Sequence, residues 1–147
     1  MCGILGYITA SNKKPNLDQF KKALISCSLR GSDATGFYTP ITGTVKKDIK
    51  ADKFIEQFGD DLSKAINSNI LLAHCRSTTS GTEKNNENNH PHESKRFVLI
   101  HNGGITKSKP PEGYDIKSKW DSEIILSFID KHGIKKGLEE MYGFDSM

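Results

Sequence analysis

The stretch MCGILGYI, residues 1–8, places a cysteine directly after the initiator methionine and directly before an apolar run. A thiol at an ordinary chain end would be frayed, exposed and open to oxidation. The apolar run from Gly3 to Ile8 is typical of a buried strand, and a strand would hold the residue before it in place. The sequence therefore predicts that Cys2 is anchored at the start of a strand.

The rest of the chain alternates between helical and strand-like patterns. Leu17, Phe20, Leu24 and Cys27 recur at helical spacing, which predicts an amphipathic helix over 17–29. We predict an α/β or α+β layered fold in which strands end at loops that carry reactive and charged residues. The further segments expected are a hairpin (36–40 and 44–50), a helical stretch (51–67), a strand (69–75), a long loop (76–95), a strand ending in a glycine pair (96–104), a loop (106–119) and a helix (120–132) that begins at Trp120 and is capped by Gly133.

Composition narrows the class of protein. The 147 residues suffice for about one domain with a proper core. Hydrophobic residues make up 35% and charged residues 27%, which is typical of a soluble globular chain, and the net charge of +3 comes from lysines scattered among acids. That charge pattern gives no support for nucleic-acid binding. No apolar stretch approaches ~18 residues, which argues against a membrane span, and the N-terminus lacks the pattern of a secretory signal.

The cysteine count points to a reducing compartment. Cys2, Cys27 and Cys75 are an odd number and contain no CxxC pair, so neither a disulfide framework nor a zinc ribbon fits. A cytoplasmic location is the simplest interpretation. Cys27 falls on the apolar face of a predicted helix and Cys75 at the end of a predicted strand, so we expect both to be structural.

Removal of Met1 would leave Cys2 with both a thiol and a free α-amine. An α-amine has a pKa of about 7.7–8.0, so it can take the thiol proton at neutral pH and later return a proton to a leaving amine. Thiolate is the reactive form of cysteine, so nucleophilic attack needs a base within reach. The alternative is that Cys2 is only a small apolar residue that opens a strand, and the dipeptide by itself favours that alternative.

An oxyanion formed at an attacked carbonyl needs fixed donors, typically a backbone N–H and an amide side chain. The sequence HNGG, residues 101–104, offers both at the end of an apolar strand. The Asn102 side chain can donate, and Gly103 permits a close approach of the backbone. Asn-Gly pairs also make ordinary turns very often, so the signal is weak when taken alone.

Two charged residues fit the two ends of an α-amino acid. We interpret Arg76 as a buried arginine that follows a predicted strand, with a planar fork suited to a carboxylate. Asp121 begins a predicted helix and could bind an ammonium group. The plainer alternatives are a surface arginine on a loop and an ordinary acid in the first turn of a helix.

Six segments follow one another along the chain from residue 2 to residue 125: MCGILGY, RGSDATGF, AHCRSTTSG, NNHPHE, VLIHNGGITK and WDSEII. In this order they resemble the glutamine amidotransferase class II domain, a glutaminase module with the N-terminal-nucleophile hydrolase fold. In motif style they are nearest to the glutaminase domains of glutamine–fructose-6-phosphate aminotransferase and amidophosphoribosyltransferase, and less like that of asparagine synthetase. Each segment is weak evidence alone, but six at sensible spacings are a specific signal.

The resemblance implies a fold and a set of catalytic residues. The fold would be a layered αββα arrangement with antiparallel sheets. Mature Cys2 would attack the side-chain carboxamide of glutamine, and Asn102 with the Gly103 N–H would hold the oxyanion. Ammonia would leave and water would hydrolyse the glutamyl thioester. Arg30 and Gly31 match the loop of the family that lies beside the nucleophile.

The resemblance also implies the substrate contacts and the partners. Arg76 would bind the α-carboxylate of L-glutamine, Thr79 would line the same pocket, and Asp121 would bind the α-ammonium. The family passes its ammonia to a second domain that aminates an acceptor, so a separate synthase or acceptor domain is the expected partner. No cofactor and no metal are implied.

The sequence departs from the family in three places. Ser77 and Ser80 stand where several relatives have an aromatic residue and a histidine. The loop 82–94 is rich in asparagine, which suggests mobility. The family's domain normally runs well past 147 residues, and EEMYGFDSM, residues 139–147, resembles the start of a further strand pair, so we expect a domain truncated at its C-terminus.

Three other functions remain open at this level. One is a different N-terminal-nucleophile amidohydrolase that acts on another amide, although the pair of Arg76 and Asp121 favours an α-amino acid substrate. A catalytically inactive glutamine-binding or regulatory module would keep the same fold and pocket. A metal protein could use five potential ligands, although these lack the repeated ligand spacing of structural zinc sites. The five are His74, Cys75, His90, His92 and His101.

Overall fold

The computed structural model describes residues 1–10, 14–79, 81–105, 109–118 and 121–142. Strands and helices largely follow the predicted segments. In chain order the elements are β1 (Gly3–Ile8), α1 (Leu17–Cys27), β2 (Ala34–Thr39), β3 (Gly43–Lys47), α2 (Ala51–Gln57), α3 (Gly59–Ala65), β4 (Ile70–Arg76), the 3-10 turn η1 (Asn86–Asn88), β5 (His92–Glu93), β6 (Val98–Leu99), α4 (Asp121–His132) and α5 (Ile134–Tyr142).

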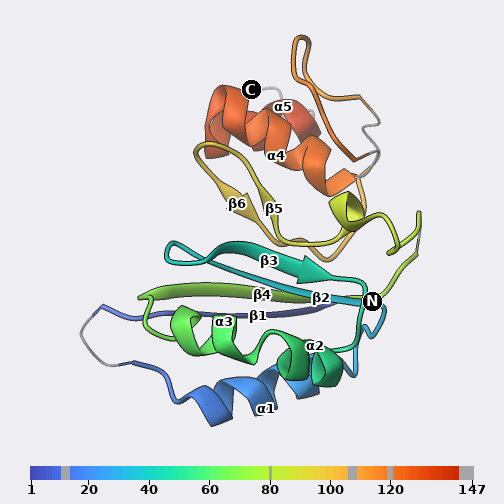
Figure 1. Ribbon diagram of the computed structural model, residues 1–147. Helices are drawn as coiled ribbons and strands as arrows, with labels where there is room; N and C mark the ends of the chain where they lie inside the picture. The colour runs from blue at the N-terminus through green and yellow to red at the C-terminus, as the bar shows by residue number, and fades with distance from the viewer. Residues whose placement is uncertain (11–13, 80, 106–108, 119–120, 143–147) are drawn as a thin grey trace.

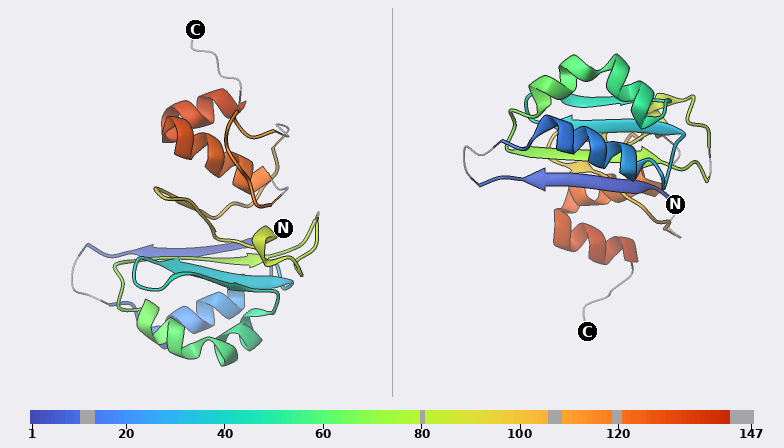
Figure 2. Two further views of the ribbon diagram at one scale, coloured as in Figure 1. Left: turned by 45° about the horizontal axis from the view of Figure 1, so that its top comes forward. Right: turned by 90° about the horizontal axis from the view of Figure 1, so that it is seen from below.

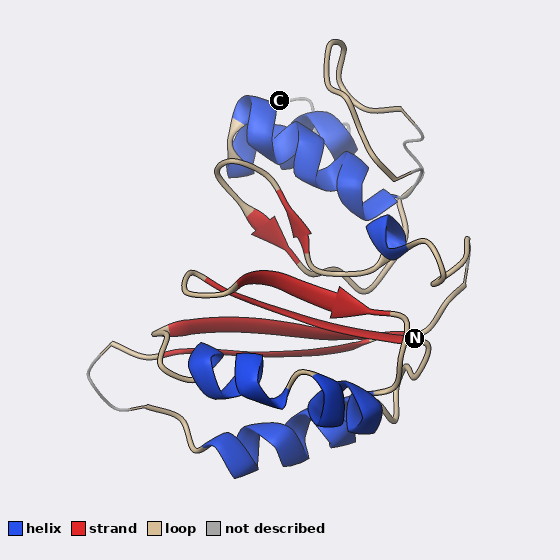
Figure 3. Ribbon diagram, in the orientation of Figure 1, coloured by secondary structure: helices blue, strands red, loops and turns tan. Residues whose placement is uncertain are grey.

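The elements form four layers (Figure 1). Helices α1, α2 and α3 cover one face of a four-stranded antiparallel sheet with the order β1-β4-β2-β3. The two-stranded antiparallel sheet β5-β6 lies on the other side, and α4 and α5 cover it. Strands therefore fill the middle of the molecule and helices its two outer sides (Figure 3). The expected mixed α/β architecture with antiparallel sheets is confirmed.

Two separate apolar cores stabilise the layers. The larger core lies between α1–α3 and the four-stranded sheet and includes Leu24, Phe37, Phe54, Leu62 and Leu71, all fully buried. The smaller core joins α4 and α5 to the small sheet through residues such as Ile125 and Phe128. Burial of this apolar surface supplies most of the stability of each half.

Strand β1 differs from the predicted buried strand. It lies at the edge of the four-stranded sheet, so only alternate side chains are covered. Leu5 and Tyr7 pack against the larger core, whereas Ile4 and Ile8 are 50% and 78% exposed. Figure 2 shows β1 along this edge of the four-stranded sheet.

The C-terminal region also differs from its prediction. Residues 139–142 belong to α5 and not to a strand pair, while residues 143–147 lie outside the described part of the chain. Helix α1 ends at Cys27, two residues earlier than predicted. Trp120, the expected first residue of the following helix, lies outside the described residues as well. Gly133, with φ of 84°, follows α4 as the predicted cap. None of the helices described is long and apolar enough to cross a lipid bilayer.

Candidate active site

The pairing of β1 with β4 places Cys2 at one end of the four-stranded sheet. Gly3 lies opposite Cys75 in the antiparallel register, so Cys2 lies beside the residues that follow β4. The Ser77 backbone N–H donates to Cys2 Sγ over 3.4 Å, and the Cys2 backbone N–H donates to Asn102 Oδ1 over 2.9 Å. The prediction that Cys2 is anchored is confirmed.

A pocket of about 260 Å³ opens at this end of the sheet. Six of the seven residues predicted for the site line it, and Arg30 is the exception. These six come from the start of β1, the end of β4, the segment after β6 and the start of α4. They are Cys2, Arg76, Thr79, Asn102, Gly103 and Asp121.

Asn102 and Gly103 lie on the turn that follows β6. Because Asn102 Oδ1 accepts the Cys2 N–H, the other polar atom of the amide, Nδ2, is a donor. A Cβ at Gly103 would lie 2.9 Å from His101 Nε2, so a larger residue there would have to displace the His101 side chain. An amide donor and a glycine backbone therefore line the same pocket as Cys2.

Arg76 is the last residue of β4 and is only 7% exposed. Its Nη1 donates to Asn89 Oδ1 over 2.9 Å. Burial lowers the pKa of Arg76, while nearby acidic groups raise it; an arginine remains charged at neutral pH in either case. The interpretation of Arg76 as a buried arginine is confirmed, and the alternative of a surface arginine is wrong.

Asp121 is the first residue of α4. Its Oδ1 accepts the Ser122 N–H over 2.8 Å, and its Oδ2 lies 3.7 Å from the position that a Cβ on Gly104 would occupy. The carboxylate therefore faces the glycine pair that follows Asn102. A negative charge is also favoured here by the helix dipole.

Arg30 lies outside the pocket lining but contacts the backbone of Cys2. Its exposed guanidinium donates from Nε to the Cys2 carbonyl over 3.3 Å. The neighbouring Gly31 packs directly on the backbone of Arg76 and Ser77, because a Cβ there would lie 2.5 Å from Arg76 C and Ser77 N. Arg30 and Gly31 thus contact the backbone of Cys2 and of Arg76 and Ser77, respectively.

Sequence reasoning missed the histidines as a structural group. His74 and His90 stack with ring centroids 4.1 Å apart, and His92 meets His90 edge-on at 4.6 Å. His74 Nε2 donates to the His101 carbonyl over 3.0 Å. His90 and His101 line the pocket, together with Asn88 and Ser122. The His-Pro-His sequence at residues 90–92 is a usable signal, but nothing in it shows that these rings are buried.

Burial keeps these rings neutral at physiological pH. It lowers the pKa of His74 to about 4, that of His92 to about 3, and that of His90 well below its usual value. Within the described part of the chain, no three or more histidine, cysteine or acidic side chains are arranged to hold a metal ion.

Comparison with curated proteins finds related enzymes. No family model matches the chain. Over 142 residues, or 90% of its length, it is 30% identical to a glutamine–fructose-6-phosphate aminotransferase (isomerizing) of Methanosarcina mazei. The enzyme of that name from Staphylococcus aureus is 32% identical over 88% of the chain, and that from Bartonella henselae 28% over 94%. The chain spans only 22–23% of the length of these relatives.

Proposed function

We propose that this chain is a class II glutamine amidotransferase domain with the N-terminal-nucleophile hydrolase fold, which hydrolyses the side-chain amide of L-glutamine. One observation carries the proposal: the Cys2 sulfur and nitrogen lie in one pocket with an amide donor, a buried arginine and an aspartate. The similarity to glutamine–fructose-6-phosphate aminotransferases, whose name includes glutamine, also supports glutamine as the substrate.

The nucleophile would be formed by removal of Met1. The Cys2 nitrogen, now an α-amine, would stay within 2.9 Å of Asn102 Oδ1 and would take the thiol proton. The Ser77 N–H, 3.4 Å from the sulfur, would stabilise the thiolate. Since Met1 lines the pocket, its removal would also make room for the substrate.

The reaction would proceed in two steps. The thiolate attacks the carboxamide carbon, and Asn102 Nδ2 with the Gly103 N–H stabilises the oxyanion. The C–N bond breaks as the protonated α-amine of Cys2 gives its proton to the leaving nitrogen. Ammonia departs and leaves a glutamyl thioester on Cys2. Water, deprotonated by the α-amine, then cleaves the thioester to give L-glutamate and restore the thiol.

The charged residues would select an α-amino acid. Arg76 would bind the α-carboxylate through its planar fork and Asp121 the α-ammonium, and Thr79 lines the same pocket. We propose that the released ammonia is consumed by a separate synthase or acceptor domain, because the relatives are named as aminotransferases that use glutamine.

The test is release of L-glutamate from L-glutamine by the purified chain, alone and beside a cognate synthase. Cys2→Ala should abolish turnover. Cys27→Ser and Cys75→Ser should leave it largely intact, because Cys75 is buried in the larger core and the partly buried Cys27 packs against that core. An electrophilic analogue of L-glutamine should modify Cys2. Mass spectrometry should show that active protein lacks Met1.

Three results would contradict the proposal. Full activity with Met1 retained would exclude the α-amine as the base. Turnover that survives Cys2→Ala would exclude the nucleophile. Binding of L-glutamine without turnover, by correctly processed protein in the presence of a synthase, would favour an inactive binding or regulatory module.

A further inference from the structure

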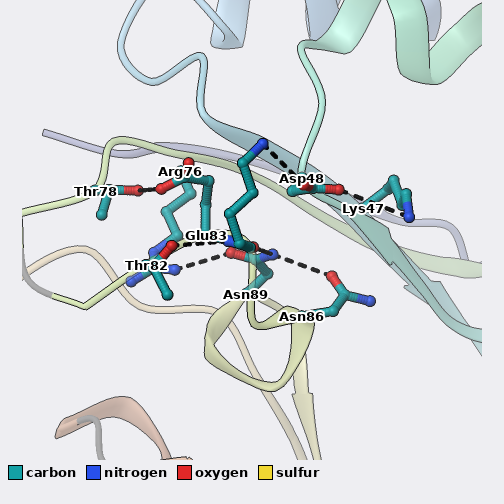
Figure 4. Close-up of polar contacts among 9 residues, drawn as sticks. Lys47, Asp48, Arg76, Thr78, Thr82, Glu83, Asn86 and Asn89 are labelled. Carbon is teal, nitrogen blue, oxygen red and sulfur yellow. Dashed lines mark hydrogen bonds and ion pairs between the residues drawn. The ribbon is translucent and has the colours of Figure 1, made fainter.

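Asn89 lies behind the pocket, in direct contact with Arg76. Its neighbours in the chain, Asn88 and His90, both line the pocket, and its own Oδ1 accepts from Arg76 Nη1 over 2.9 Å (Figure 4). We propose that Asn89 is a positioning and specificity residue, which fixes the Arg76 guanidinium through a neutral amide and so keeps its positive charge available for the α-carboxylate of the substrate. This inference rests on the proposed function.

The orientation of the Asn89 amide is determined by its surroundings. Asn89 is 1% exposed, and its Nδ2 donates to the Glu83 carbonyl over 2.8 Å and to Asn86 Oδ1 over 3.0 Å. Since both of these partners are acceptors, the amide nitrogen must face them and the oxygen must face Arg76. The amide therefore cannot flip without losing three hydrogen bonds.

The backbone around Asn89 is fixed as well. Lys46 on β3 donates from Nζ to the Asn89 carbonyl over 2.7 Å, and the Asn89 N–H donates to the Asn86 carbonyl over 3.1 Å. The Asn86 side chain donates to the Lys46 carbonyl over 2.9 Å. Asparagine residues thus hold the loop that is expected from the sequence to be mobile, and they connect Arg76 at the end of β4 to β3, two strands away in the sheet.

The choice of an amide over a carboxylate has an electrostatic consequence. An aspartate of the same shape at position 89 would form a buried ion pair with Arg76, and such a pair is strongly attractive at low dielectric. It would compete with a substrate carboxylate for the same guanidinium. An amide oxygen orients the guanidinium and leaves its net charge intact.

The experiment compares two substrates that differ in one group. L-Glutamine carries the α-carboxylate, and 4-aminobutanamide has the same amine and carboxamide without it. Asn89→Asp should lower kcat/KM for L-glutamine by ~10–100-fold, mainly through KM, because hydrogen bonds to charged groups contribute about 1.5–3 kcal/mol and 1.4 kcal/mol is tenfold. The kcat/KM for 4-aminobutanamide should change by less than about threefold, which is within ~0.7 kcal/mol.

Two further variants keep the test interpretable. Asn85→Asp is the matched control: it makes the same amide-to-carboxylate change on the exposed side of the loop, where the side chain accepts the Glu87 N–H, and it should leave the ratio between the two substrates unchanged. Asn89→Ala removes the anchor without adding charge and should raise KM for L-glutamine less than Asn89→Asp does. In Cys2→Ala protein, calorimetry of L-glutamine binding measures the same effect without turnover.

The outcomes separate this inference from the proposed function. Wild-type protein that neither hydrolyses nor binds L-glutamine refutes the proposed function and this inference with it. Normal wild-type turnover with an unchanged KM in Asn89→Asp refutes the inference alone. Equal losses for both substrates in Asn89→Asp and Asn89→Ala would show a merely structural role and would also overturn it.

Discussion

Gly31 shows how closely the backbone packs behind the pocket. A Cβ at this position would lie 2.5 Å from Arg76 C and Ser77 N, both of them backbone atoms. Rigid backbone cannot yield as a flexible side chain can, so any larger residue must displace the end of β4. That end carries both the buried arginine and the N–H that donates to the Cys2 sulfur.

We expect Gly31→Ala to lower the free energy of unfolding by about 1–3 kcal/mol, the usual cost of overpacking, and to impair glutamine turnover. Urea unfolding and glutamate release measure the two effects. Gly59→Ala is the control, because α3 begins there and no atom lies within 4 Å of the added Cβ; it should be neutral or slightly stabilising. Equal stability of the two variants would contradict this prediction.

At the level of residues, the sequence was sufficient to predict candidate site residues whose chemistry is evident from the residue type and the residues next to it in the chain. A cysteine before a strand, an Asn-Gly pair and an arginine after a strand can be recognised without coordinates, and the structure places them around one pocket. Burial of His90 and Asn89 could not be predicted in this way. It depends on a loop folding back over the sheet, and Gly36 on β2 permits this, since a Cβ there would lie 2.2 Å from the His90 carbonyl oxygen.

At the level of elements, β1 leaves an apolar face uncovered. Ile8 lies opposite Ile70 of β4 in the register, and the two are 78% and 39% exposed. Ile4 extends the same face along the strand. Exposed apolar residues on a sheet edge favour association between molecules.

We therefore expect Ile8→Thr to reduce concentration-dependent light scattering while changing the free energy of unfolding by less than about 0.5 kcal/mol, as for other surface substitutions. Leu5→Thr makes a similar change on the opposite face of the strand, where Leu5 packs against the larger core. It should cost about 2 kcal/mol or more. If Ile8→Thr were as destabilising as Leu5→Thr, the face would be covered in solution.

The periodicity of apolar residues predicted most elements correctly, because most helices and strands here have one apolar and one polar face. Helix α5 was missed although Ile134, Leu138 and Met141 recur at helical spacing. A glycine at its centre, Gly137, lowers intrinsic helix propensity. The structure requires that glycine, because a Cβ would lie 2.6 Å from the Phe128 carbonyl oxygen where α5 crosses α4. Such a contact between helices cannot be read from local sequence.

At the level of the whole molecule, a polar layer connects the two apolar cores. The stacked rings of His74, His90 and His92 lie in it, and the Thr44 hydroxyl on β3 donates to Glu93 Oε2 over 2.6 Å. Burial holds the pKa of each of these three histidines below its usual value. Cohesion between the layers therefore depends on rings that must stay neutral.

This predicts a loss of stability in mild acid. The unfolded chain takes up a proton at each histidine near pH 6.5, while His74 and His92 in the folded chain do so only near about 4 and about 3. The unfolded state thus binds more protons below pH 6.5, so the stability present at neutral pH falls as pH decreases. From pH 7 to 5.5 the loss should be about 1 kcal/mol per histidine.

Urea unfolding at the two pH values measures this loss. His92→Asn should reduce the difference by about 1 kcal/mol, because it removes one titrating group. Hydrogen exchange should show which layer opens as pH falls. An unfolding free energy that is the same at pH 7 and pH 5.5 would contradict the prediction.

The position of Met1 has a practical consequence for anyone who makes this protein. Met1 lines the pocket, and Arg30 Nη2 lies 3.9 Å from its sulfur. An affinity tag fused ahead of Met1 would extend from the pocket. It would also keep the Cys2 nitrogen as a peptide amide, whereas the proposed mechanism uses that nitrogen as a free α-amine. The tag therefore belongs at the other end of the polypeptide, or must be cut off by a protease that leaves the cysteine as the first residue.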